Sequence, residues 1–132
     1  MDRHSLCIAG ETNIGVGRVR NEDNYCILAP PAFSAALAVV CDGIGGHRDG
    51  DVASLYCCRR LMEEFHRRGG GIRTGAEGGD FLAGVLADIN ARLFRRSEFD
   101  GLKRPMGCTA ICAVFTAAEL AFCGAGDSRL YR

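Results

Sequence analysis

The chain has 132 residues, 48% hydrophobic and 24% charged, which suits one domain of ordinary size with enough apolar side chains for a core. Sixteen basic side chains balance sixteen acidic ones, which argues against a surface for nucleic acid or anionic membrane. No apolar run approaches the ~20 residues of a membrane span, and the apolar stretch before Glu11 is too short for a secretory signal. We therefore expect a cytoplasmic protein with no nucleic-acid or membrane partner.

Apolar runs predict three strands in the first third of the chain. Two short strands are expected over residues 6–12 and 24–29, joined by the polar loop NIGVGRVRNED (13–23). The run SAALAVVCD (34–42) is almost continuously apolar. We therefore expect it to be a central strand that is covered on both faces.

Two helices follow the glycine-rich loop. Residues 51–68 are predicted to be helical, with Asp49 or Asp51 capping the start. The apolar stripe of this helix is expected to be Val52, Leu55, Cys58, Met62 and Phe65. Residues 69–79 contain six glycines and predict a flexible connector. The apolar face of the second helix is expected to be Leu82, Val85, Leu86, Ile89 and Leu93.

The last part of the chain predicts a hairpin. Strands over 109–116 and 119–126 are separated by a turn at residues 117–118. Strands, then helices, then strands, with short connections, indicate an α+β fold in which an antiparallel sheet or sandwich is covered by a helical pair. Residues 130–132 have the pattern of another strand or turn without a polar tail, so we expect the chain to end inside a domain.

The eight cysteines predict core packing. Four lie inside strand-like runs: Cys26, Cys41, Cys112 and Cys123. Free cysteine often serves as a small buried apolar residue. No pair has the spacing of a zinc ribbon, and Cys57 and Cys58 are adjacent on a helix and point apart. A structural zinc site is therefore not expected.

Acidic residues stand at three strand ends. They are Glu22 and Asp23 before the second strand, Asp42 after the third, and Asp127 after the last. One aspartate at a strand end is usually a turn former or a cap, but together these residues could converge at one sheet edge. Magnesium and manganese prefer oxygen ligands, to which the Gly43 carbonyl could contribute. Arg18 could then grip an anion beside the metals.

Four segments in order resemble the metal-dependent serine/threonine phosphatases of the PPM (protein phosphatase 2C) family, most closely their bacterial branch. They are GVGRVRNED (15–23), VVCDGIGGH (39–47), GCTA (107–110) and GDSRLY (126–131). In the third segment, Cys108 replaces the serine of the family's motif. The four together are much more specific than any one of them, and the match covers essentially the whole chain.

The resemblance implies a role for each matching residue. Asp42 would bridge two Mn²⁺ or Mg²⁺ ions, with the Gly43 carbonyl as a further ligand. Glu22 would act through coordinated water with support from Asp23, and Asp127 would help to hold a third, weaker ion. Arg18 would grip the substrate phosphate. A water molecule acidified by two cations would attack phosphorus in line and release the serine or threonine alkoxide of a phosphorylated protein. A cognate serine/threonine kinase is an expected partner.

One position differs from many animal members of this family, which have a histidine two residues after the bridging aspartate. Ile44 stands there, as an apolar residue commonly does in the bacterial branch, so coordinated water would protonate the leaving group. His47 is a weaker candidate for that role.

The family's remaining metal-binding aspartates lie in a C-terminal half. The resemblance therefore implies that residues 1–132 are the N-terminal portion of a four-layer αββα domain, an antiparallel β-sandwich flanked by antiparallel helices and incomplete at the C-terminus. We expect this piece to be inactive alone and prone to self-association through uncovered strands.

Two other functions are alternatives to a phosphatase. A non-catalytic phosphatase-like module that binds a partner or a phosphopeptide is the alternative from a different class. A nucleotide phosphate loop at GIGGHRDG (43–50) is disfavoured, because it lacks the Lys-Ser/Thr of a P-loop and does not fit the spacing of a dinucleotide fingerprint.

Overall fold

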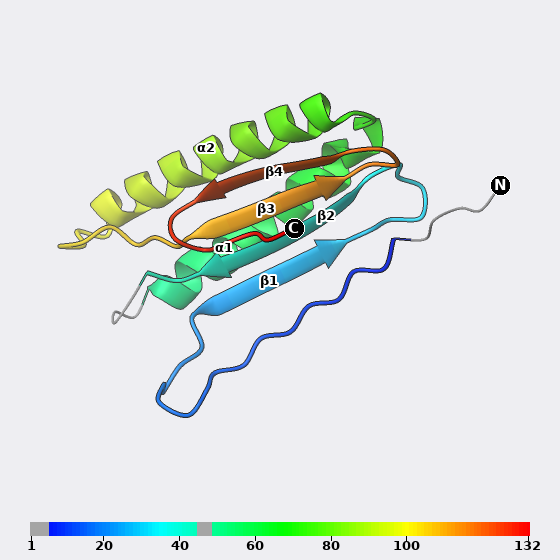
Figure 1. Cartoon of the computed structure of the whole chain (residues 1–132). Helices are drawn as coiled ribbons and strands as arrows, with labels where there is room; N and C mark the ends of the chain where they lie inside the picture. Colours follow the sequence, from blue (N-terminus) through cyan, green and yellow to red (C-terminus); the bar gives the residue numbers. More distant parts are fainter. Residues whose placement is uncertain (1–5, 45–48) are drawn as a thin grey trace.

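The computed structural model describes residues 6–44 and 49–132, and Figure 1 shows the arrangement. The strands are β1 (Asp23–Leu28), β2 (Ala36–Asp42), β3 (Ala110–Phe115) and β4 (Leu120–Ala125), and they form one sheet in the order β1-β2-β3-β4 with every pair antiparallel. The helices are α1 (Gly50–Arg68) and α2 (Gly75–Phe99), with a short 3-10 helix, η1 (Gly69–Gly71), between them.

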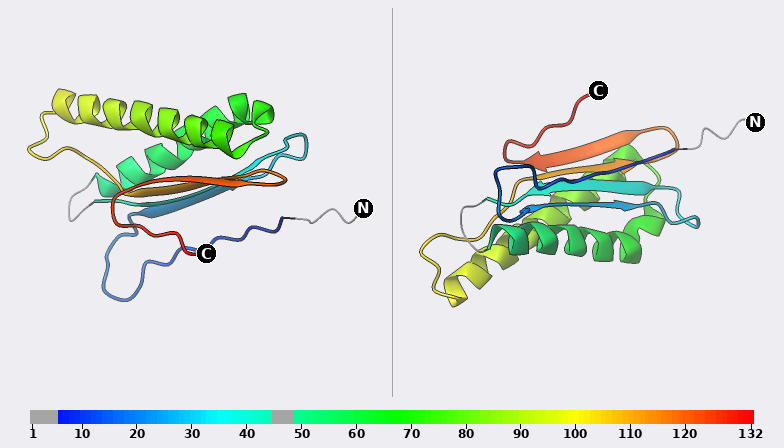
Figure 2. Two further views of the ribbon diagram at one scale, coloured as in Figure 1. Left: turned by 45° about the horizontal axis from the view of Figure 1, so that its top comes forward. Right: turned by 90° about the horizontal axis from the view of Figure 1, so that it is seen from below.

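Both helices cover the same face of the sheet. Figure 2 shows α1 and α2 on one side, running in opposite directions, and the segments before β1 and after β4 on the other. The predicted α+β class, with an antiparallel sheet and antiparallel helices, is therefore confirmed, and these residues form one sheet and one helical layer. None of the described helices is both long enough and apolar enough to cross a membrane.

Strand β2 is central, as expected, but only one of its faces is fully covered. Leu37, Val39 and Cys41 are at most 2% exposed and belong to the core under the helices. Val40, on the opposite face, is 50% exposed. The expectation of cover on both faces was therefore wrong, because an antiparallel sheet can pack one face on a core and leave the other hydrated.

The buried face of α1 differs from the predicted stripe. Its buried side chains are Ala53, Ser54, Cys57, Cys58, Leu61 and Phe65, together with Gly50. Val52, Leu55 and Met62 are exposed instead. Small side chains in the first two turns let α1 lie close to β1 and β2. The largest apolar residues of those turns are consequently not the ones that face the sheet.

The start of α1 is not capped by a side chain in the described structure. Asp49 occupies the N-cap position, but its side chain accepts no cap hydrogen bond. Asp51 Oδ1 accepts a hydrogen bond from Val52 N at 2.9 Å, within the first turn. Asp49 is thus the N-cap residue, as predicted, but its side chain does not form the capping hydrogen bond that was expected.

Helix α2 begins earlier than expected, so the predicted connector over 69–79 was too long. Thr74 and Glu77 form a reciprocal capping box, which stabilises a helix start at Gly75. A Cβ at Gly78 would lie 3.1 Å from Val114 Cγ1, which shows how closely the first turn of α2 approaches β3. The predicted apolar face of α2 is confirmed by the burial of Leu82, Val85, Ile89 and Leu93.

The predicted strand over residues 6–12 is absent. These residues pass along the helix-free face of the sheet without a strand assignment (Figure 1), and Gly10 lies directly against the ring of Tyr25. Asn21 Nδ2 donates to Thr12 Oγ1 at 2.9 Å, which ties this segment to the loop before β1. The hairpin at 117–118 is confirmed, with Thr116 N donating to Glu119 O at 2.8 Å.

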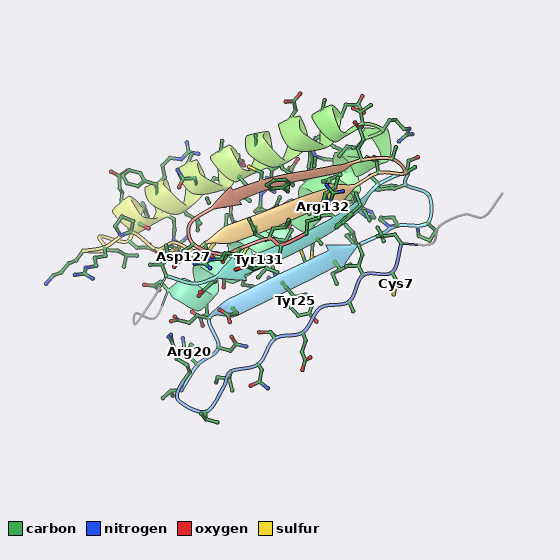
Figure 3. All side chains as sticks on the ribbon, in the orientation of Figure 1. Cys7, Arg20, Tyr25, Asp127, Tyr131 and Arg132 are labelled. Carbon is green, nitrogen blue, oxygen red and sulfur yellow. The ribbon has the colours of Figure 1, made fainter. Side chains whose placement is uncertain are left out.

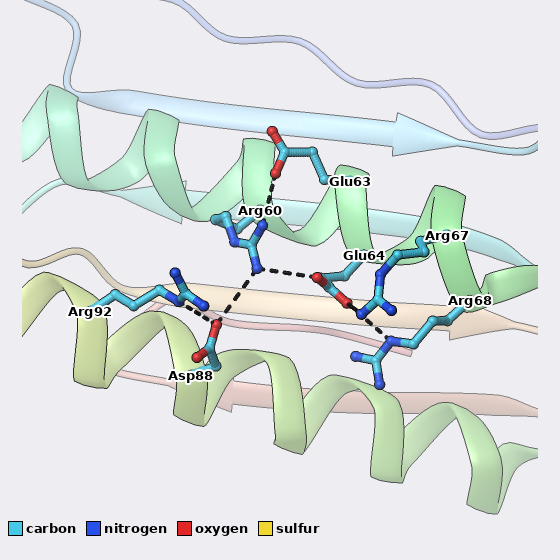
Figure 4. A network of polar contacts seen from close by, with 7 residues as sticks. All are labelled: Arg60, Glu63, Glu64, Arg67, Arg68, Asp88 and Arg92. Carbon is cyan, nitrogen blue, oxygen red and sulfur yellow. Dashed lines mark hydrogen bonds and ion pairs between the residues drawn. The ribbon is translucent and has the colours of Figure 1, made fainter.

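Ion pairs join the outer surfaces of the two helices (Figure 4). Arg60 of α1 lies 3.1 Å from Glu64 and 3.7 Å from Asp88 of α2. The other members of the network are Glu63, Arg67, Arg68 and Arg92. Arg60, Arg67 and Arg68 of α1 are thus paired with neighbouring carboxylates.

Candidate metal and phosphate site

Two aspartates face each other at one edge of the sheet. Asp23 is the first residue of β1, Asp42 is the last residue of β2, and the two are direct cross-strand partners. Because side chains alternate along a strand, Asp42 points away from the helices, opposite to its buried neighbour Cys41. Like charges directly opposite one another destabilise a sheet, so this pair suggests a role other than folding.

The electrostatics of Asp42 show which other charged groups lie near it. Partial loss of hydration, then the charge of Asp23 and that of Asp127, raise the pKa of Asp42, although its side chain stays exposed. The Arg18 guanidinium lowers that pKa and partly offsets the repulsion. Four of the residues predicted for the site therefore lie within electrostatic range of one another.

A turn after β4 brings Asp127 to this edge. Gly126 has φ = 93°, a left-handed conformation that favours glycine, and a Cβ there would also lie 2.7 Å from Thr109 Cγ2. The chain reverses at this point and returns across the helix-free face, so that Asp127 lies at the same end of the sheet as Arg20 (Figure 3). The sequence predicted the residue, and the turn explains its position.

Thr109 links the backbone of Asp42 to the returning tail. Thr109 N donates to Asp42 O at 2.7 Å, and Asp42 N donates to Thr109 Oγ1 at 3.1 Å. The same hydroxyl is 2.5 Å from Ser128 Oγ. Thr109 is 5% exposed, so these buried bonds fix the position of Ser128, the residue after Asp127, relative to Asp42. Thr109 and Ser128 lie within the quoted motifs, but their supporting role was not predicted.

Glu22 lies on the other side of the strand from Asp23. Its carbonyl oxygen accepts hydrogen bonds from Gly43 N at 3.1 Å and from Ser54 Oγ at 2.6 Å. Its carboxylate lies beside Gly50, where an added Cβ would be 3.2 Å from Glu22 Cδ. The structure therefore places Glu22 next to Gly43 and the first turn of α1. Ser54 and Gly50 follow the second motif and belong to the resemblance; the hydrogen bond by which Ser54 fixes this corner was not predicted.

Gly43 is held between two backbone segments. A Cβ at this position would lie 2.5 Å from the carbonyl carbon of Gly50 and 2.9 Å from Glu22 O. Gly43 also forms an antiparallel bridge with Cys108. No side chain fits here, which gives the first glycine after Asp42 a packing reason.

The loop before β1 carries two exposed arginines, Arg18 and Arg20, of which Arg20 is held by an ion pair. Arg20 Nη1 lies 3.1 Å from Asp51 Oδ2, which ties the loop to the first turn of α1. Arg18 is exposed and is near enough to Asp42 to lower its pKa. Ile44 is 65% exposed. Gly45, Gly46 and His47 lie outside the described residues, so the suggested role of His47 is untested.

A cavity of about 480 Å³ adjoins the acidic edge on the helix-free face. Asp23, Asp42, Asn13 and Ser128 line its polar end, and Tyr25 is among the residues lining the remainder. The acidic residues therefore border an open volume that can admit a ligand.

The donor set at the edge fits a hard divalent cation. It consists of carboxylates and a nearby backbone carbonyl, which are the ligands that Mg²⁺ and Mn²⁺ take. Partial loss of hydration, and after it the charges of Asp23 and Asp127, raise the pKa of Asp42, so a cation at this edge would relieve repulsion between the carboxylates. No three acidic residues in the described ranges bring their oxygens within 4.8 Å of one another, and the one trio of potential ligands that does so is Cys41, Cys57 and Cys108. The acidic edge thus forms a partial ligand set.

The chain is similar in sequence to bacterial serine/threonine phosphatases. It is 31% identical over 117 residues to serine/threonine phosphatase Stp of Listeria monocytogenes, covering 87% of this chain and 46% of that protein. It is 29% identical over 129 residues to serine/threonine protein phosphatase PstP of Mycobacterium tuberculosis, covering 96% of this chain and 22% of that protein. The chain thus spans about half the length of the Listeria relatives and a smaller share, 22%, of the mycobacterial one. No family model matches it.

Solved structures give the same relationship. Serine/threonine phosphatase Stp1 from Staphylococcus aureus superposes with a TM-score of 0.74 at 28% identity, over 89% of this chain and 45% of that one. The catalytic domain of PstP in complex with two manganese ions superposes with a TM-score of 0.66 at 25% identity, over 89% of this chain and 46% of that one.

Sequence and fold therefore agree with the resemblance stated from the four motifs: the chain is similar to bacterial serine/threonine phosphatases over most of its own length and matches about half or less of theirs.

Proposed function

We propose that residues 1–132 form the N-terminal portion of a protein serine/threonine phosphatase domain that uses Mn²⁺ or Mg²⁺. The observation that carries the proposal is the facing pair Asp23 and Asp42, with Asp127 and Arg18 close enough to shift the pKa of Asp42. Asp23 and Asp42 line an open cavity, and the charges of Asp127 and Arg18 act on Asp42 from two other parts of the chain. That arrangement costs folding energy and is explained by a bound cation and a bound anion.

Each residue has a distinct part in this proposal. Asp42 would bind metal through its carboxylate, Gly43 through its carbonyl, and Asp23 and Asp127 would supply further oxygen donors. Glu22 sits deeper, beside Gly50, and would reach the metal through water. When bound, divalent cations supply an acidified water molecule and neutralise charge on the phosphoryl group.

Arg18 would bind the phosphate of a phosphorylated serine or threonine. A guanidinium donates to phosphate in a fixed fork geometry, which positions the phosphoryl group as well as attracting it. Arg18 is suited to this role because it is exposed and near Asp42. Arg20, by contrast, is occupied by Asp51.

Manganese titration of the 132-residue chain is the direct test of the metal-binding part. The described ligands are few and spread apart, so we expect weak binding, with a dissociation constant on the order of 10⁻⁴–10⁻³ M, as for loosely built oxygen sites. Asp42→Asn should weaken binding further, whereas Asp80→Asn, an exposed change in α2, should leave it unaltered. Equal effects of the two substitutions would place the metal elsewhere.

Turnover requires a more complete ligand set. We expect the 132 residues alone to hydrolyse p-nitrophenyl phosphate no faster than buffer with the same manganese, because the carboxylates at this edge form only a partial ligand set and this chemistry would need two bound cations. In an active protein completed with the second half of a related domain, Asp42→Asn should remove nearly all manganese-dependent activity. Arg18→Ala should mainly raise KM for a phosphorylated substrate.

These measurements also separate the proposal from the alternative of a non-catalytic module. Phosphopeptide binding that needs no manganese, together with a completed protein that remains inactive, would favour the module. Activity that survives Asp42→Asn would contradict the phosphatase mechanism itself.

A further inference from the structure

We propose that Cys41, Cys57 and Cys108 form a three-sulfur site for a thiophilic cation, with Cu(I) preferred over Zn²⁺. The three sulfur atoms lie within 4.8 Å of one another, and no other trio of cysteine, histidine, aspartate or glutamate in residues 6–44 and 49–132 converges in this way. This inference is independent of the proposed phosphatase function.

The three thiols come from three different elements. Cys41 is in β2, Cys57 is in α1, and Cys108 lies just before β3, where it forms a bridge with Gly43. They converge because α1 packs over β2, and the end of β2 lies beside the residues just before β3. The rigid core around Cys41 and Cys57, which are 0% and 2% exposed, holds two of the three sulfurs in place.

Packing alone does not explain the convergence. Cys112, which is 0% exposed, packs in the same core and lies outside the trio, and Cys58, whose thiol neighbours that of Cys41, does not come within 4.8 Å of all three sulfurs. Small apolar filling needs only volume, whereas three sulfur atoms directed at one point also provide a set of metal donors. Cys108 is half-buried, so the trio is not sealed inside the core.

The donor chemistry selects the ion. All three donors are sulfur, and soft thiolate ligands select Cu(I) and zinc over the hard cations that would bind at Asp42. Structural Zn²⁺ is almost always four-coordinate, and in the described ranges no fourth cysteine, histidine or carboxylate lies within 4.8 Å of all three sulfurs. Cu(I) accepts a site of three sulfurs. The acidic edge and the thiol trio would therefore bind different metals although Cys41 and Asp42 are adjacent.

A cavity provides access to the trio. It has a volume of about 190 Å³ and is lined by Cys57, Cys108 and Met106, among others. The thioether of Met106, which lines the same cavity, is a further soft donor. Two of the three residues of the trio, Cys57 and Cys108, therefore border this cavity.

The test is a competition titration of the reduced chain under anaerobic conditions, with Cu(I) supplied as its bathocuproine disulfonate complex. All proteins carry Cys7→Ala, which removes the exposed thiol. We expect the chain to withdraw one equivalent of Cu(I). Cys41→Ala, Cys57→Ala and Cys108→Ser should each lower the affinity at least about tenfold, as loss of one of three ligands does, and Zn²⁺ should compete poorly.

Cys112→Ala is the matched control, since Cys112 is 0% exposed and lies on the neighbouring strand; it should leave the first equivalent unchanged. Far-UV circular dichroism checks the fold of each variant, and Cys108→Ser keeps the test valid if the more buried substitutions unfold the chain. X-ray absorption of the one-to-one complex should show sulfur donors only. The proposal is overturned by no withdrawal of Cu(I), by tighter binding of Zn²⁺, by nitrogen or oxygen donors, or by an equal loss in Cys112→Ala.

Discussion

Replacing Gly43 by alanine tests how closely the candidate site is packed. The new Cβ would lie 2.5 Å from the carbonyl carbon of Gly50 and 2.9 Å from Glu22 O, where ordinary contact begins at 3.4 Å. The difference, 3.4 − 2.5, means that β2 and the start of α1 must separate by about 1 Å. Both neighbours are backbone, so no side-chain rotation relieves the contact. Gly43 is not among the positive-φ glycines, so the cost is steric.

Overpacking of this kind costs about 1–3 kcal/mol. With a urea slope of about 2 kcal/mol/M, a loss of 2 kcal/mol lowers the unfolding midpoint by about 1 M. Because the displaced backbone also carries Asp42, manganese affinity should fall by about tenfold or more, as it does when groups supporting metal ligands are changed.

Urea unfolding followed by circular dichroism, and calorimetric titration with manganese, measure the two effects. Gly17→Ala is the matched control, because a Cβ at that exposed position meets nothing within 4 Å. If Gly43→Ala unfolds at the same urea concentration as Gly17→Ala and binds manganese equally well, the close approach of Gly43 to α1 is wrong.

Three further predictions concern stability without metal. Partial loss of hydration and the charge of Asp23 raise the folded-state pKa of Asp42 above its unfolded value of 3.8. The stability that this carboxyl contributes is therefore present below pH 3.8 and is lost as pH rises through the raised pKa. Asp42→Asn should stabilise the chain by only roughly 0.5 kcal/mol at pH 7, because the exposed side chain is screened by water, and should have no effect at pH 3, as urea unfolding at both pH values would show. Ser97→Ala should cost about 1–3 kcal/mol in the same assay, because Met106 N would lose its acceptor, 2.9 Å away, at a side chain that is 2% exposed. Thr74→Ala should cost about 1 kcal/mol by removing the N-cap of α2, and an unchanged midpoint would contradict the capping box.

Local pattern was enough to predict most of the sheet. Short apolar runs located β1 to β4 within a few residues, and the spacing of Leu82, Val85 and Ile89 identified the buried face of α2. These predictions succeed because the period of a strand or a helix is a local property of the backbone. The four motifs likewise indicated Arg18 and Asp42 before any contact was known.

Local pattern failed where a partner segment decides the outcome. Residues 6–12 have the pattern of a strand, but they do not pair with β1. The glycines at the start of α2 suggested a connector, but the Thr74–Glu77 capping box starts the helix at Gly75, and Gly78 packs closely against Val114. In α1, the small residues rather than Val52 and Leu55 face the sheet.

The sequence by itself determined the order of the elements, the antiparallel sheet and the residues that supply charge at its edge. Only the tertiary structure placed Asp23 opposite Asp42, brought Asp127 back through the turn at Gly126, and gathered the three thiols of the Cys41–Cys57–Cys108 trio. The physical reason is range. Periodicity and turn chemistry act over a few residues, whereas these meetings depend on strand register and on how closely α1 packs against the sheet.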